Sequence, residues 1–345
     1  MGACMLALVG NPTWAQQSPP KPSPGAAQPT SVPPLRPAEI DNKLTIGGED
    51  INAKTSATRM TVDTMINGHG PYRFLVDSGA DSSVISRRIA KDLQLRLATP
   101  TVIHTTTADA VVDRVAVDEL SFGPSTTYDL ELPALDEADI GGDGLLGIDV
   151  LAKQRLMLDF EKRLIRSEDA RTPATLVDGE IVVTAVRRRG QLILTQAEAL
   201  GLPIEAVIDT GSEITIGNLA LRDKLLRGNR DKFETIKVTG VTGVTLDLQF
   251  ARIAELRIGS IVLEDVPMAF ADVPPFALFR MTNKPALLLG TDLLSVFRRV
   301  SLDFQSRRVR FQLRKCGTTG VFISVAPSMG ATRIRSGKDD QVCGR

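Results

Sequence analysis

The sequence predicts an all-β fold of two similar lobes with a few short helices, and three observations support this prediction. Apolar runs are short, rich in Val, Ile and Thr, and separated by Gly, Asn, Pro and Asp, which is typical of strands joined by turns. Of the 345 residues, 43% are hydrophobic, which is enough for two cores of medium size. Three motifs also occur twice in the same order, and this indicates a duplicated unit.

The duplicated unit is defined by three pairs of matching segments. Residues 74–81 match 206–213, residues 145–151 match 288–294, and residues 158–160 match 302–304. In these pairs Asp-Ser-Gly corresponds to Asp-Thr-Gly, while Leu-Leu-Gly and Leu-Asp-Phe occur in both copies. A single insertion of about eleven residues between the first two motifs accounts for the spacing.

The chain begins with segments that are not expected to join a core. Residues 1–15 hold a short apolar run and end in Thr-Trp-Ala, so they resemble a secretory leader, although no Lys or Arg precedes the run. Residues 16–39 are rich in Pro, Ser, Gln and Ala, which predicts an extended tether. The apolar run is shorter than the roughly 20 residues that cross a bilayer. We therefore expect an exported protein, periplasmic or extracellular, without an integral membrane segment.

The two lobes are expected at residues 40–170 and 171–315, with a connector at 170–180 and a tail at 316–345. Each lobe should open with a hairpin that leads into its Asp motif. In the first lobe, strands at 60–66 and 72–76 flank a turn at residues 67–70 that includes His69. In the second lobe, residues 192–196 and 204–208 take these positions.

Short helices and loops complete the predicted lobes. Turn residues precede four candidate helices, at Ser86–Leu93, Asp149–Gln154, Asn218–Leu226 and Asp292–Phe297. Residues 141–144 are rich in Gly but lack the Gly-Lys-[Ser/Thr] ending of a phosphate-binding loop, so we interpret them as a surface loop. Residues 187–190 (Arg-Arg-Arg-Gly) are interpreted as a solvated hairpin turn.

Composition argues against several classes of function. The chain has 41 Lys and Arg against 41 Asp and Glu, so no net field attracts nucleic acid. His69 and His104 are the only histidines, and no metal-ligand spacing or Ser-His-Asp pattern surrounds them. We expect neither a metal nor a cofactor. Cys316 and Cys343 could form one disulfide in an oxidising compartment or remain two thiols.

The Asp motifs carry the chemistry. Each follows an apolar strand, which places the carboxylates of Asp77 and Asp209 at the exits of their strands. The Gly of each motif permits close backbone approach, and its amide can bond the carboxylate. The hydroxyls of Ser78 and Thr210 can reach across to the opposing loop. One such tripeptide alone is commonly a turn, but two strand-led copies, each followed by Leu-Leu-Gly, favour a functional pair.

With these motifs the sequence resembles the retropepsin-like and pepsin-like aspartic peptidases. Their hallmark is two hydrophobic residues, Asp, Ser or Thr, Gly and Ala or Ser, followed later by two hydrophobic residues and Gly. The resemblance covers most of residues 55–315. Each half is similar to one retropepsin protomer, which implies the acid-protease fold. Viral retropepsins bring two such halves together by homodimerisation, whereas this chain would supply both halves in one polypeptide. It also implies that the chain acts as a monomer.

The resemblance implies a role for each matched residue. Asp77 and Asp209 would be the catalytic pair, supported by Ser78, Gly79, Thr210 and Gly211, with Gly147 and Gly290 behind the loops and Asp81 and Glu213 near substrate. Hairpin flaps would cover the site. Residues 238–244, with Gly240 and Gly243, fit one flap tip, whereas the equivalent residues 102–109 contain no Gly. Neither region has the Tyr of a pepsin flap, so retropepsins are the closer comparison.

The implied reaction is hydrolysis of a peptide bond in an extended polypeptide. Two neighbouring carboxyl groups share one proton and hold a water between them. The carboxyl pair of aspartic proteases is the standard example of this arrangement. Two alternatives remain. The chain could be an inactive peptide-binding module of the same fold, and residues 16–39 could be a pro-segment that is cleaved or that occupies the site.

Overall fold

The computed structural model describes residues 49–56, 59–105, 109–172, 181–225, 233–239, 244–314 and 322–325. The predicted leader and tether, Cys316 and Cys343 lie outside these ranges. In the described part of the chain, strands dominate and the six helices are short, so the all-β prediction is confirmed. The domain boundaries remain a prediction, because the last strand of the first half ends at Asp169 and most of the connector is not described.

In the first lobe, the short strand at residues 144–146 lies between two neighbouring strands and pairs with both. Its strands are β1 (Glu49–Ser56), β2 (Arg59–Ile66), β3 (His69–Val76), β4 (Val84–Ser86), β5 (Leu97–His104), β6 (Asp109–Phe122), β7 (Ser125–Leu135) and β8 (Gly144–Leu146), and its helices are α1 (Arg87–Asp92), α2 (Glu137–Ile140) and α3 (Ile148–Leu151). Strand β8 pairs in parallel with β3 and antiparallel with β4. The loop from β3 to β4, which carries Asp77, therefore lies beside the C-terminal end of β8.

The second lobe repeats this connectivity. Its strands are β11 (Ile181–Arg188), β12 (Gln191–Ala199), β13 (Leu202–Ile208), β14 (Ile216–Gly217), β15 (Glu234–Thr239), β16 (Thr245–Ile258), β17 (Ile261–Phe270), β18 (Ala286–Leu289) and β21 (Phe322–Val325), and its helices are α4 (Leu219–Leu225), α5 (Pro274–Leu278) and α6 (Thr291–Leu294). Strand β18 pairs in parallel with β13 and antiparallel with β14. Strand β21, within the predicted tail, pairs with β17.

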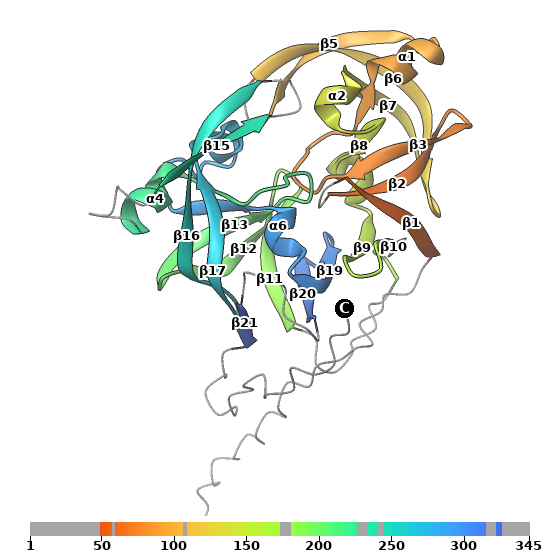
Figure 1. Ribbon diagram of the computed structural model, residues 1–345. Helices are drawn as coiled ribbons and strands as arrows, with labels where there is room; N and C mark the ends of the chain where they lie inside the picture. Colours follow the sequence, from red (N-terminus) through yellow and green to blue (C-terminus); the bar gives the residue numbers. More distant parts are fainter. Residues whose placement is uncertain are drawn as a thin grey trace, which may run out of the picture. The chain divides into compact units, whose positions relative to one another are not determined.

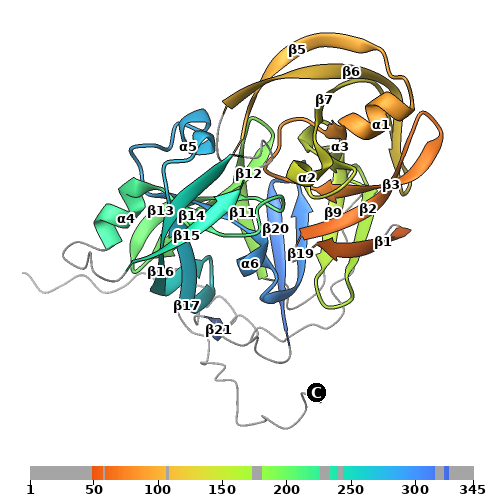
Figure 2. The ribbon, with the colours of Figure 1, turned by 45° about the horizontal axis from the view of Figure 1, so that its top comes forward.

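A six-stranded antiparallel sheet joins the lobes, in the order β1, β10 (Leu164–Asp169), β9 (Gln154–Asp159), β19 (Phe297–Asp303), β20 (Arg308–Leu313) and β11. Figure 1 shows β9, β19, β20 and β11 between the orange strands of the first lobe and the cyan strands of the second, and Figure 2 shows the blue β19 and β20 between β11 and β9 after rotation. At the centre, Met157 of β9 faces Ser301 of β19. The two Leu-Asp-Phe motifs thus meet in one sheet.

Two ion pairs connect β9 to β19, and in each pair an Arg of one strand contacts an Asp of the other. Arg155 Nε lies 2.9 Å from Asp303 Oδ2, and Arg299 Nε lies 2.6 Å from Asp159 Oδ2. All four side chains are buried. Arg155 also pairs with Glu168 of β10, so these contacts connect three neighbouring strands of the sheet.

Local sequence signals explain the helices that were anticipated. The Ser86 hydroxyl accepts a hydrogen bond from the Ile89 amide, as expected of an N-cap, and Asn218 caps α4 through the Leu221 amide at 2.9 Å. Helices α3 and α6 are both shorter than predicted, because Gln154 opens β9 and Phe297 opens β19. Helices α2 and α5 were not predicted, since segments of four or five residues carry little periodic pattern.

Two predicted turns differ in detail. The first hairpin turns on Asn67 and Gly68 alone, with φ of 49° and 74°, and His69 already belongs to β3. The turn at 187–190 is confirmed as the link from β11 to β12, but its arginines are not merely solvated. Arg188 donates a bidentate pair of hydrogen bonds to the Glu205 carboxylate, and Arg189 forms an ion pair with Asp81 of the other lobe.

Candidate active site

The two Asp loops interlock through their hydroxyl residues. The Ser78 amide donates to Thr210 Oγ1 at 2.9 Å, and the Thr210 amide donates to Ser78 Oγ at 3.2 Å. The Ser78 hydroxyl donates to the Ile208 carbonyl at 2.9 Å, and the Thr210 hydroxyl donates to the Val76 carbonyl at 2.8 Å. Ser78 and Thr210 are buried. Each loop therefore satisfies the polar groups of the other, and the structure brings together the two loops that the sequence singled out.

Backbone amides orient each carboxyl group. Asp77 Oδ1 accepts hydrogen bonds from the amides of Gly79 at 2.8 Å and Ala80 at 3.1 Å. In the second lobe, Asp209 Oδ1 accepts the equivalent bonds from Gly211 at 3.0 Å and the following residue at 3.1 Å. One oxygen of each carboxyl group is thus held by its own loop, and the other oxygen is left for chemistry.

Each carboxyl group lies against the opposite Asp loop. The Asp209 carboxyl group faces Gly79 and the Asp77 carboxyl group faces Gly211, which brings the two acids close enough for the charge of Asp209 to act on Asp77. The glycines make this approach possible, because a Cβ on Gly79 would lie 2.6 Å from Asp209 Oδ1, and a Cβ on Gly211 would overlap the Asp77 carboxyl group. Glycine is required at both positions for steric reasons.

The close approach changes the titration of both carboxyl groups. Burial, and then the negative charge of Asp209, raise the pKa of Asp77 to about 7. Burial also raises the pKa of Asp209. Hydrogen bonds from backbone amides and the positive charge of Arg59 lower the pKa of both carboxyl groups. Because like charges in close proximity resist double ionisation, the pair favours the state that holds one proton.

A second acid supports each loop from behind. The Ser83 hydroxyl donates to Asp149 Oδ1 at 2.7 Å and accepts from the Gly147 amide at 2.9 Å. In the second lobe Thr215, Asp292 and Gly290 repeat these contacts at 2.7 and 3.1 Å. Sequence reasoning placed the two glycines behind the loops but missed the roles of these acids. The signal was present, because an Asp follows both copies of Leu-Leu-Gly at the same spacing.

The acids at the ends of the Asp motifs reach across to the opposite lobe. Asp81 pairs with Arg189 at 3.1 Å and accepts a hydrogen bond from Gln191. Glu213 Oε1 lies 3.1 Å from Arg59 Nε. The sequence predicted these acids near substrate, and that role stays a prediction. Arg59 was not anticipated, because its partner is distant in sequence.

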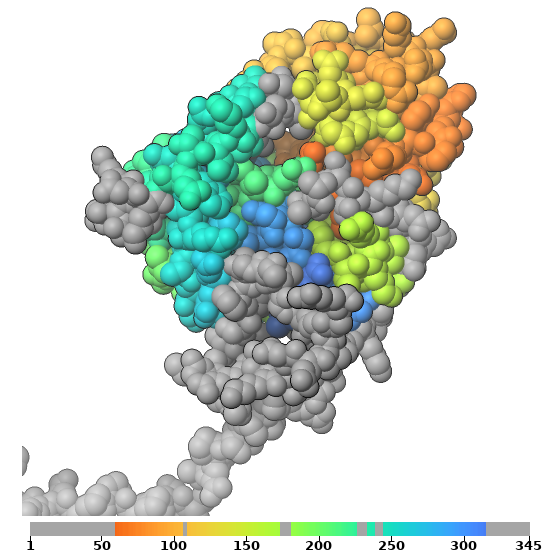
Figure 3. All heavy atoms as spheres, in the orientation of Figure 1, coloured from red at the N-terminus to blue at the C-terminus, as the bar shows by residue number. Residues whose placement is uncertain are grey.

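Two hairpins stand where flaps were expected. Strands β5 and β6 form the first and pair His104 with Asp109, whose Nδ1 and Oδ1 atoms are 2.9 Å apart. Strands β15 and β16 form the second. Residues 106–108 and 240–243, with Gly240 and Gly243, lie outside the described residues. Figure 3 shows a recess between the lobes beneath these hairpins.

Other kinds of site have no counterpart in the described ranges. No group of three or more His, Cys, Asp or Glu side chains among these residues is arranged to hold a metal ion. None of the helices that the structure describes is long and apolar enough to cross a membrane.

The two halves of the chain also match a known family. A family model described as an aspartyl protease matches residues 62–150 and 195–293, which together make up more than half of the chain. One matched segment contains Asp77 and the other contains Asp209. No curated protein matches the chain.

Proposed function

This chain belongs to the aspartyl protease family, and we propose that it is an endopeptidase in which Asp77 and Asp209 jointly activate one water molecule. The observation that carries the proposal is the meeting of the two Asp loops, which interlock through Ser78 and Thr210 and hold each carboxyl group against the glycine of the opposite loop. A binding module would not need two buried acids pressed together, because their mutual repulsion lowers stability.

The proposed reaction uses the single proton of the pair. The ionised carboxylate takes a proton from water while the water oxygen attacks the scissile carbonyl carbon, and the protonated carboxyl group donates its proton to the carbonyl oxygen. The resulting gem-diol then collapses. One hydroxyl proton returns to a carboxylate, the carbon–nitrogen bond breaks, and the leaving nitrogen takes a proton from the pair. The products are a carboxyl group and an amine, and the pair again holds one proton.

The recess between the lobes suits an extended polypeptide. Strands β5 and β15 each have one edge that pairs with no strand in the described part of the chain, and these edges could bind a substrate backbone by strand-like pairing. In this proposal both lobes of one chain form the whole site, so the monomer is active. Export to the periplasm or the extracellular space is part of the proposal, on the likeness of residues 1–15 to a leader.

The test is cleavage of a denatured protein and of a diverse peptide library, with and without pepstatin. We expect Asp77→Asn and Asp209→Asn each to lower the rate by at least about a hundredfold. Asp118→Asn is the matched control, because Asp118 is an exposed carboxyl group of β6. Retained peptide binding without cleavage in the unmodified protein would instead identify a non-catalytic peptide-binding module.

A further inference from the structure

Gln191 is a fully buried residue of the second lobe that contacts the Asp loop of the first lobe. It opens β12, and its Nε2 atom donates to the Gly79 carbonyl at 3.3 Å and to the Asp81 carboxylate. Its Oε1 atom is buried as well and has no hydrogen-bond partner in the described part of the chain. A buried acceptor without a donor lowers stability, and an apolar side chain of similar size would avoid that cost. Stability alone therefore does not explain an amide at this position.

The contact to Gly79 places Gln191 behind the peptide group that holds Asp77. The Gly79 carbonyl and the Ala80 amide belong to one planar peptide group, and they point in opposite directions because the peptide is trans. The Ala80 amide donates to Asp77 Oδ1 at 3.1 Å on one side, while the carbonyl accepts from Gln191 on the other. The two bonds strengthen each other, because a carbonyl that accepts a hydrogen bond polarises the N–H of its own peptide group. Gln191 is thus linked to the Asp77 carboxyl group through one peptide group.

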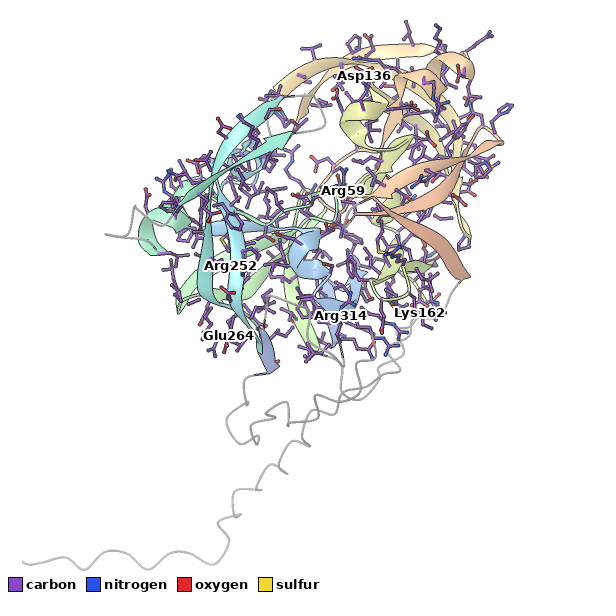
Figure 4. All side chains as sticks on the ribbon, in the orientation of Figure 1. Arg59, Asp136, Lys162, Arg252, Glu264 and Arg314 are labelled. Atoms are coloured by element: carbon purple, nitrogen blue, oxygen red, sulfur yellow. The ribbon has the colours of Figure 1, made fainter. Side chains whose placement is uncertain are left out.

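The second Asp loop differs in the contact that it receives from the opposite lobe. Arg59 occupies the position in the first lobe that Gln191 occupies in the second, the same number of residues before its Asp motif. It also lies where the two lobes face each other (Figure 4). Its guanidinium donates to Glu213 at 3.1 Å and to the Ile140 carbonyl at 3.3 Å. Among the described residues, no hydrogen bond joins it to the Gly211 carbonyl, so these contacts hold the motif's peptide group from the opposite lobe in the first loop but not in the second.

A neighbouring residue separates two roles that Gln191 could have. Arg189, in the turn before Gln191, contacts the other oxygen of the Asp81 carboxylate at 3.1 Å, and its described hydrogen bonds go to this carboxylate. Arg189 therefore joins the lobes through Asp81 and leaves the Gly79 peptide group untouched. Gln191 joins the lobes at the same carboxylate and reaches the peptide group in addition.

We propose that Gln191 is a positioning residue of the active site, because it fixes the Gly79–Ala80 peptide group and through it the orientation of the Asp77 carboxyl group. The inference rests on the proposed function and goes beyond it, since it gives a part in the reaction to a buried residue outside both Asp motifs. Without the bond from Gln191 the peptide group is free to turn, and Asp77 Oδ1 loses a well-directed donor. A carboxyl group that is turned away from the reacting atoms slows the chemical step more than it weakens the binding of substrate.

Four variants separate positioning from mere contact between the lobes. Gln191→Met keeps the size of the side chain but removes both hydrogen bonds, so kcat should fall about ten- to a hundredfold while KM changes less than about threefold. Arg189→Met removes the other contact to Asp81 and should leave kcat within about twofold of the unmodified protein. Gln196→Met makes the same chemical change at an exposed position of β12 and should also leave kcat unchanged. Gln191→Leu repeats the test if the methionine variant does not fold.

Hydrogen exchange of backbone amides, followed by NMR in the same proteins, reports on the peptide group without any substrate. In Gln191→Met the Ala80 amide should exchange at least about tenfold faster than in the unmodified protein, because its bond to Asp77 is no longer supported from behind. The rate is taken relative to the amides of β13, so that a change in global stability does not enter. In Arg189→Met and Gln196→Met the Ala80 amide should keep its rate.

Slower cleavage together with faster Ala80 exchange, in the Gln191 variants alone, supports the inference. An unchanged Ala80 amide in Gln191→Met would overturn it, and so would faster exchange with an unchanged kcat. The same effects in Arg189→Met would also overturn it, because contact between the lobes would then be what matters. If the unmodified protein cleaves nothing, the proposed function fails, and the Ala80 exchange rate alone then decides whether Gln191 holds the peptide group.

Discussion

Replacing Asp77 by Asn should make the protein more stable at alkaline pH but not at acid pH. Asp77 has a folded-state pKa of about 7, raised from the ordinary value of 3.8. Between these values the folded protein binds more protons than the unfolded chain, so the free energy of unfolding falls as pH rises from about 4 to about 7. Asn carries no charge, and its oxygen can keep the hydrogen bonds from Gly79 and Ala80.

The magnitude follows from the size of the pKa difference. A shift from 3.8 to about 7 corresponds to about 4 kcal/mol at pH values above 7. In a chain of 345 residues, with an unfolding entropy of about 2.1 cal/mol/K per residue, each kcal/mol moves the melting temperature by roughly 1.5 °C. The variant should therefore melt about 6 °C above the unmodified protein at pH 8. At pH 4 the difference should largely vanish, because Asp77 is then protonated.

The assay is calorimetric melting of both proteins from pH 4 to pH 8, with Asp118→Asn as the exposed control. The control should follow the unmodified protein at every pH. A difference between Asp77→Asn and the unmodified protein that is the same at pH 4 and pH 8 would refute the reasoning, because it would mean that Asp77 is neither buried nor close to the charge of Asp209. The experiment needs no substrate, so it tests the geometry of the pair independently of catalysis.

Three further substitutions test other contacts. Gly79→Ala should abolish cleavage, because its Cβ would overlap the Asp209 carboxyl group, and a crystal structure or retained melting temperature would show that the fold survives. Ser78→Ala should lower the free energy of unfolding by about 1–3 kcal/mol, since it leaves the buried Thr210 amide unpaired; equal denaturation midpoints would contradict this. Asp303→Leu should lower it by about 1–3 kcal/mol, because buried Arg155 loses one of its two acid partners and keeps Glu168; adding Glu168→Gln should cost more than the sum of the two single changes, and additive losses in urea denaturation would argue against a coupled cluster.

Local patterns were sufficient for the parts of the site that lie within one short segment. An apolar strand followed by Asp-Ser-Gly or Asp-Thr-Gly sets the direction of the carboxyl group, because the strand, the small residue and the following amides are contiguous. The hairpins before these loops and the caps of α1 and α4 were predictable for the same reason. The two copies of the motif also indicated that two such loops belong together.

Contacts between residues far apart in the sequence could not be read in this way. Nothing local to Arg59 indicates that it meets Glu213, and nothing near Arg155 indicates Asp303. These pairings depend on the distance between the packed lobes and on the register of the strands that join them. A linear sequence pattern specifies neither quantity. The candidate catalytic residues were thus visible along the chain, whereas the charges that surround the acid pair and the ion pairs that join the lobes emerge only when the duplicated halves fold against each other.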